Sequence, residues 1–174
     1  ATSMGLDTQA SGNRSTAMGN DTAASGDEAT AMGGFTNAVG QYSTAMGRVT
    51  TATGKASTAM GGNGVTASGN RSTAMGNQTT ASGTNSTAMG SVTEAATDVS
   101  LSIGRYNDAN TSDDNTLLVA GNGFSNSNRS DALVLDQNGN LEISGTLTEN
   151  SDRRLKEQIQ PLGSGVLGNL GEIE

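Results

Sequence analysis

Residues 72–90 read STAMGNQTTASGTNSTAMG, and this stretch decides the fold. The string Ser-Thr-Ala-Met-Gly occurs twice in it, fourteen residues apart, with the near-copy Thr-Thr-Ala-Ser-Gly midway. Over the first 90 residues glycine returns every seven residues, apart from one inserted residue at Gly61-Gly62, whereas methionine returns every fourteen. The repeating unit is therefore fourteen residues long and consists of two unlike halves.

The seven-residue spacing first suggests a coiled coil, which needs two apolar positions per heptad in strong helix formers. Each heptad here instead contains a glycine, Ser or Thr, and an Asn-rich corner. Because glycine costs about 1 kcal/mol per helical position relative to alanine, the repeat excludes helix. The alternation in Thr16-Ala17-Met18 predicts a short strand with Thr and Met on one face and Ala on the other. Pairs such as Gly19-Asn20 and Gly76-Asn77 predict corners, because both residue types accept a positive φ.

Two strands and two corners per repeat make one coil of a β-solenoid, so the fold class is all-β. With coils about 4.8 Å apart, about six or seven of them give a rod roughly 30 Å long. The methionines then form one column, which we interpret as apolar packing rather than a metal or oxidation site. Because one column is a thin core, we expect three chains to pack this face around a common axis. The predicted trimer-core residues are Met18, Met32, Met46, Met60, Met75, Met89 and Ile103.

The composition argues against most enzymes and against nucleic acid as a partner. Cysteine and histidine are absent, which removes thiol and imidazole nucleophiles and the usual zinc or haem ligands, so no cofactor or metal is expected. The net charge of −8 arises entirely in residues 91–174, with thirteen carboxylates against five basic groups. A phosphate backbone would require a basic stripe, which the sequence lacks. The sequence contains no apolar run long enough for a membrane span, and its opening residues, in phase with the repeat and unlike a signal peptide, suggest a piece of a longer protein.

The run Ser-Thr-Ala-Met-Gly, at 15–19, 43–47, 57–61, 72–76 and 86–90, resembles the head repeat of YadA-like trimeric autotransporter adhesins, Asn-Ser-Val-Ala-Ile-Gly. Thr replaces Val and Met replaces Ile, although the run at 100–104 returns closer to the family form. The resemblance covers about residues 1–104. It implies a left-handed parallel β-roll that assembles as a homotrimer in an extracellular fibre.

The pattern weakens after Gly90, because Thr97 stands where a glycine is due. We expect a last imperfect coil, an Asn/Asp-rich loop over 106–115, a strand at 117–119 and a turn at 121–123. Alternating apolar residues around Asn138-Gly139 predict a β-hairpin over 132–144. The acidic residues in this part lack the ordered spacing of a calcium loop and are interpreted as solvated surface. Residues 105–150 are thus a transition and hairpin region and a candidate tip.

The string from Gly145 to Leu162 resembles the junction of the endosialidase-type intramolecular chaperone found at the ends of phage tail spikes and fibres. The resemblance implies self-cleavage after the trimer has folded, with Ser151 as nucleophile and Asp152 as the residue after the cut. The residues alone also predict a helix start at Ser151, followed by an apolar stripe. Residues 151–174 are therefore expected to begin a chaperone-like segment with short C-terminal helices.

These features favour a trimeric extracellular fibre segment, on a cell surface or in a virion tail fibre, that attaches to glycan or protein on host or prey cells. The ligand is expected at loops within 91–150, because an invariant repeat offers little local specificity. One alternative is an ice-binding solenoid that presents its threonine columns to a crystal lattice. Another is part of a phage tail spike whose glycan-degrading activity lies elsewhere, since the repeat lacks the paired carboxylates of a glycosidase.

Overall fold

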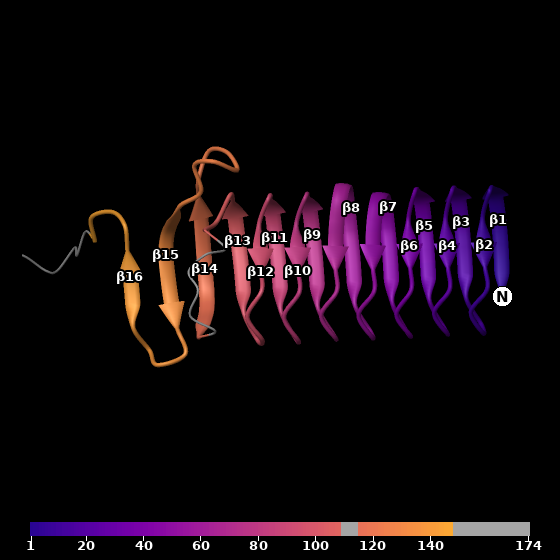
Figure 1. Ribbon diagram of the computed structural model, residues 1–174, viewed down its shortest axis with the longest axis horizontal. Helices are drawn as coiled ribbons and strands as arrows, with labels where there is room; N and C mark the ends of the chain where they lie inside the picture. The colour runs from indigo at the N-terminus through magenta and orange to yellow at the C-terminus, as the bar shows by residue number, and fades with distance from the viewer. Residues whose placement is uncertain (109–114, 148–174) are drawn as a thin grey trace, which may run out of the picture.

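The computed structural model describes residues 1–108 and 115–147, and all regular structure in these residues is β-strand. Figure 1 shows the strands side by side in one long row, with β1 at one end and β16 at the other. In chain order the strands are β1 (Thr2–Leu6), β2 (Gln9–Ala10), β3 (Thr16–Asn20), β4 (Ala23–Ala24), β5 (Thr30–Gly34), β6 (Asn37–Ala38), β7 (Thr44–Ala52), β8 (Thr58–Ala67), β9 (Thr73–Asn77), β10 (Thr80–Ala81), β11 (Thr87–Ser91), β12 (Glu94–Ala95), β13 (Leu101–Arg105), β14 (Thr116–Asn122), β15 (Asp131–Asp136) and β16 (Leu141–Ile143).

Each coil of the repeat combines one long and one short strand, and equivalent strands of successive coils pair in parallel. The long side runs β1-β3-β5-β7-β8-β9-β11-β13-β14, and the short side includes β2, β4, β6, β10 and β12. Strands β7 and β8 continue through the corner and contribute to both sides. The register is fourteen residues, as in the pair Met4 and Met18. The predicted parallel solenoid of fourteen-residue coils is confirmed, with about eight turns.

The interior of the solenoid is built from small side chains. Thr16-Ala17-Met18 shows the predicted alternation: Ala17 is fully buried, whereas Thr16 and Met18 lie half-buried on the outer side. Small residues suit this interior because they let the two sides of a coil approach closely. The buried alanine columns are Ala17, Ala31, Ala45, Ala59, Ala74 and Ala88 on the long side and Ala24, Ala38, Ala52, Ala67, Ala81 and Ala95 on the short side. They are flanked by buried hydroxyl columns of Ser15, Ser43, Ser57, Ser72 and Ser86 and of Thr22, Thr36, Thr50, Thr79 and Thr93.

Glycine recurs every seven residues because successive coils approach too closely for a side chain. A Cβ atom at Gly19 would lie 1.9 Å from the carbonyl oxygen of Gly33, and one at Gly26 would lie 2.2 Å from that of Gly40. The prediction that Gly-Asn pairs occupy the left-handed corners was only partly right. Gly19 has a φ of 134°, but the left-handed residue at that corner is Asp21, with a φ of 50°, rather than Asn20. Close backbone approach is therefore the requirement that both halves of the repeat share.

The short side of the solenoid ends at β12, where Thr97 replaces glycine. Each glycine on this side leaves room for a carbonyl group of the following coil. The last such carbonyl belongs to Thr97, and its oxygen would lie 2.2 Å from a Cβ atom at Gly83. Asn107 closes this end, because its Oδ1 accepts from the Glu94 backbone N–H at 2.7 Å and its Nδ2 donates to the Glu94 carbonyl at 2.8 Å. The side-chain amide thus replaces the next strand and covers an open sheet edge.

The long side continues past the repeat with a change of strand direction. Strand β14 is parallel to β13, and Gly121 pairs with Gly104. The predicted turn at 121–123 is therefore wrong up to Asn122, since Gly121 extends the glycine column inside a strand. Strands β15 and β16 add antiparallel, which confirms the predicted hairpin, and Gly139 in its loop has a φ of 85°. The expected helices at 151–174 lie outside the described residues.

Candidate interaction surfaces

The predicted trimer-core residues form one column on the outer side of the long strands. Met4, Met18, Met32, Met46, Met60, Met75, Met89 and Ile103 follow one another in register. None of them belongs to the interior of the chain, and Met75 and Ile103 are each 37% exposed. The threonine column of Thr16 and its equivalents lies beside them on the same side. The chain alone therefore leaves a half-exposed methionine and threonine stripe along the rod.

This stripe continues into the hairpin as a wider hydrocarbon surface, which was not predicted from the sequence. Leu101 pairs with Leu118, Leu118 with Leu135, and Leu135 with Leu141. A second row runs from Ile103 through Ala120 and Leu133 to Ile143. Paired residues of adjacent strands point to the same side of a sheet. We call the two rows and the methionine column together the apolar face. In the sequence, this face corresponds to the apolar run at 132–135 and to the alternation of apolar and acidic residues at 141–143.

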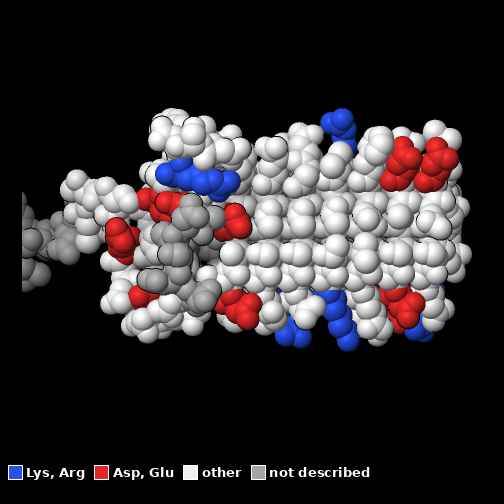
Figure 2. Space-filling view, viewed as in Figure 1, with Lys and Arg blue, Asp and Glu red and all other residues white. Residues whose placement is uncertain are grey.

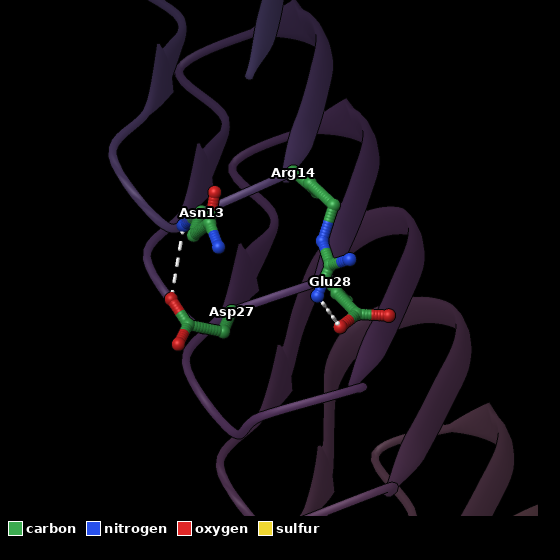
Figure 3. A network of polar contacts seen from close by, with 4 residues as sticks. All are labelled: Asn13, Arg14, Asp27 and Glu28. Atoms are coloured by element: carbon green, nitrogen blue, oxygen red, sulfur yellow. Dashed lines mark hydrogen bonds and ion pairs between the residues drawn. The ribbon is translucent and has the colours of Figure 1, made fainter.

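The polar corners join coils to one another, and their side chains are engaged within the chain. At one corner the backbone N–H of Asn13 donates to Asp27 Oδ1 at 2.9 Å, and Arg14 forms an ion pair with Glu28 (Figure 3). The ion pair is exposed and contributes little to stability. The same backbone-to-side-chain bond recurs between other coils, from Lys55 to Asn70 at 3.1 Å and from Thr84 to Asp98 at 2.6 Å. These bonds between coils give Asp27, Asn70 and Asp98 a structural role at the corners.

The loop between β14 and β15 projects beyond the ends of the strands (Figure 1). It carries the aromatic residue Phe124. Phe124 is 73% exposed, and the guanidinium of Arg105 lies 4.8 Å from the centre of its ring. Figure 2 shows basic side chains gathered over this end of the molecule, where Arg105 and Arg129 are the basic residues among the described part of 91–147. In the sequence, this cluster is indicated only by a single aromatic residue in an Asn/Ser-rich segment.

Acidic residues near this end form no metal centre: within the described ranges no group of three or more Asp or Glu side chains is placed to hold an ion. Burial raises the pKa of Asp131, and the nearby charges of Asp108 and Glu142 raise it further, against a backbone hydrogen bond from Asp108 that lowers it. Hydrogen bonds from Asn140 lower the pKa of Asp136 in the hairpin loop. A cavity of about 20 Å³ beside Asn107 has room for about one water molecule and no organic ligand.

Comparison with protein families gives one assignment. The family model described as YadA head domain repeat (2 copies) matches residues 1–22, 10–36, 24–49, 38–63 and 67–92, which together cover just over half of the chain. A comparison with curated protein sequences gave no match. Nothing in these comparisons supports the chaperone-like resemblance, and Ser151 and Asp152 lie outside the described residues. Among the residues that the structure describes, no helix is long and apolar enough to cross a bilayer.

Proposed function

Because this chain belongs to the YadA head repeat family, we propose that it is a trimeric extracellular fibre segment that attaches to the surface of another cell. The head repeats indicate an adhesin-type fibre, and the family is generally non-enzymatic. The proposal includes the trimer interface, the ligand, and the location of the fibre on a bacterial surface or in a phage-type tail fibre.

The observation that carries the proposal is the apolar face. A soluble monomer rarely exposes a long contiguous apolar surface, and such surfaces usually mark contacts with other molecules. Here the surface follows the whole rod from Met4 to Ile143, and Leu141 at its far end is 57% exposed. Three chains that turn this face to a common axis would remove it from water and would leave the polar corners outside. Met18, Met32, Met46, Met60, Met75, Met89 and Ile103 are the proposed trimer-core residues.

The repeat and the region that follows it have different roles in this proposal. The coils within 1–104 present the same corner chemistry again and again, so they act as a spacer. The region 105–150 carries unique loops and is the proposed tip, where surface glycan or protein would bind. Attachment is tested by incubating the fluorescently labelled full chain with a panel of bacterial and animal cells. The proposal expects saturable binding to some of them, and binding no better than that of an unrelated acidic protein would contradict it.

Self-processing is a separate proposal for the residues after the hairpin. The string around Ser151-Asp152 resembles a chaperone junction, so we propose cleavage between these residues in a longer chain that contains the complete chaperone. The test is to express that longer chain with Ser151→Ala beside the parent and to compare them on a denaturing gel. A cleaved parent with an intact variant supports the proposal, and equal cleavage of both refutes it.

One observation favours the ice-binding alternative. The threonines of the long strands lie in register on the outer side of the solenoid, as an ice-binding surface would require; they are Thr16, Thr30, Thr44, Thr58, Thr73 and Thr87. The methionine column beside them interrupts the hydroxyl array, and the proposed trimer would bury both. A thermal hysteresis assay on the full chain at millimolar concentration decides the matter, since inactivity removes this alternative.

A further inference from the structure

The loop of residues 122–130, which we call the tip loop, combines an exposed ring with a surround of short polar side chains. Its sequence is Asn-Gly-Phe-Ser-Asn-Ser-Asn-Arg-Ser, and Asn122, Asn126, Ser127 and Asn128 are all exposed. Phe124 is the most exposed of the large apolar side chains in the described residues. An exposed aromatic residue among small amide and hydroxyl groups is the composition of adaptable recognition surfaces.

Hydrogen bonds hold the tip loop in one conformation. Within the loop the Phe124 N–H donates to the Asn128 carbonyl and the Asn128 N–H to the Ser125 carbonyl, both at 3.0 Å. The Ser130 N–H donates to the Tyr106 carbonyl at 3.1 Å and ties the loop to the last corner of the repeat. Gly123 is buried, since a Cβ there would lie 2.5 Å from the Tyr106 carbonyl oxygen. The ring is therefore presented from a fixed backbone, which lowers the entropy cost of binding.

The two arginines beside the loop have different tasks. Arg129 donates to the Asn107 carbonyl at 2.8 Å and to Asn126 Oδ1 at 3.2 Å, so its guanidinium fastens the loop to the end of the solenoid. Arg105 is exposed, its guanidinium lies over the Phe124 ring, and within the described residues no carboxylate lies at ion-pair distance from it. A guanidinium held over a ring keeps its fork of donors oriented for a carboxylate.

We propose that the tip loop and Arg105 bind acidic glycans through a carboxylated sugar. The hydrocarbon face of the pyranose ring would pack on the open side of Phe124, and the sugar carboxylate would receive both donors of the Arg105 fork. Sugar hydroxyls would exchange hydrogen bonds with the amides of Asn122 and Asn126. The proposal rests on the proposed attachment function and gives that attachment its ligand class.

A second copy of the chain fits this surface less well than a sugar does. The apolar face is built from Met, Leu and Ile, whereas the tip loop is built from Asn and Ser around one ring. The loop also lies at the corner that follows β14 and outside the rows of the apolar face, since the last β14 residue in those rows is Ala120. Fixed polar groups around a single ring suit a ligand that is itself apolar on one side and rich in hydroxyls at its rim.

The test is a printed array of uronic-acid and sialic-acid oligosaccharides, each beside its carboxyl-reduced counterpart, probed with the full chain. The wild type is expected to bind carboxylated members and not their reduced counterparts. Phe124→Ala and Arg105→Gln are each expected to weaken that binding about tenfold or more, as central anchors do. Tyr42→Ala is the matched control, because Lys55 lies 5.9 Å from the Tyr42 ring in a second exposed cation and ring pair, within the repeat.

The outcomes separate this proposal from the attachment function. The proposal is supported if both tip variants lose the carboxylate-dependent binding and the Tyr42→Ala control keeps it. It is overturned if the wild type binds no carboxylated sugar, if the variants bind as the wild type does, or if Phe124→Ala changes the mass of the protein in solution, which would make the loop a contact between copies. If wild type and Phe124→Ala adhere equally to cells, attachment stands without this site. If the wild type adheres to none, the attachment function itself fails.

Discussion

The repeat and the hairpin region share one continuous row of long strands but differ in how they use it. In the repeat, each position of the coil has one task along the rod: Ala fills the interior, Gly lets coils approach, and Thr and Met lie outside. From β13 onward Leu and Ile replace Thr and Met on the outer side, and Asn107 closes the short side. Strand β14 is still parallel to β13, and the antiparallel pairing begins with β15. The structure of a coil therefore depends on the spacing between backbones, whereas the structure at the end of the rod depends on individual side chains.

The largest effect is expected where backbone spacing is tightest. Gly33→Ala would place a Cβ 1.9 Å from the Gly47 carbonyl oxygen at a φ of 123°, so the stack of coils must open. We expect a loss of about 3 kcal/mol in unfolding free energy or failure to fold. The measurement is urea unfolding followed by circular dichroism.

The neighbouring glycine provides the control for this prediction. A Cβ at Gly34 would meet its nearest atom, the Asn20 carbonyl oxygen, only at 4.0 Å. Gly34→Ala is therefore expected to unfold like the wild type. Equal loss in both variants would mean that glycine composition, and not contact between coils, holds the repeat together.

The second prediction concerns the residue that closes the short side. Asn107→Leu removes both hydrogen bonds to the Glu94 backbone and leaves a part-buried N–H and carbonyl without those partners. The expected loss is about 2 kcal/mol. Hydrogen exchange at the Glu94 backbone amide should be slower in the wild type than in the variant, which would locate the loss of stability at this residue. Asn20→Ala, at an exposed corner, is the control, and a variant as stable as the wild type would show that the solenoid needs no side-chain cap.

A gain in stability is expected from a substitution inside the repeat. Thr36 Oγ1 is buried without a hydrogen-bond partner in the described structure, and Val65 occupies the equivalent place in the same column. Thr36→Val keeps the shape, removes the unpaired hydroxyl, and should add about 1 kcal/mol. The reverse change, Val65→Thr, should lower the unfolding free energy by a similar amount. If Thr36→Val instead lowered the unfolding free energy and Val65→Thr raised it, these hydroxyls would have partners that stabilise the fold.

The smallest effect is a pH dependence at the hairpin. The folded pKa of Asp131 is raised above its ordinary value of 3.8 by burial, so the protonated carboxyl favours folding and the charged one opposes it. The sign follows: stability from this group is complete below pH 3.8 and is lost as the pH rises through the folded pKa. Asp131→Asn should therefore be the more stable protein at pH 7, by about 1 kcal/mol or less, with the two converging near pH 3. A constant difference across that range would contradict this assignment.

The coil could be predicted from sequence because its information is periodic. Spacing and alternation predicted the fourteen-residue coils and the placement of Thr and Met on one face with Ala on the other. They did not predict which of the two faces lines the interior of the coil. The reason for the glycines could not be predicted, because it depends on a distance between coils rather than on local conformation. The parallel pairing of β14 also escaped prediction, since Gly121 follows Gly104 by seventeen residues instead of fourteen and is a single repeat signal. The tip loop depends on one aromatic residue and on contacts with Tyr106 and Asn107, which no spacing rule reveals.

The proposed trimer, in which the apolar face joins three chains, is tested by the mass of the protein in solution. Light scattering on the purified full chain should give three times the 17.4 kDa of one chain. The double variant Met46→Asp/Met60→Asp should give a smaller mass, because charges on the apolar face cannot be buried without partners. Thr51→Asp, on the outer side of the short strands, is the matched control and should keep the trimer mass. A folded wild type of 17.4 kDa, or a double variant that remains trimeric, would contradict the claim.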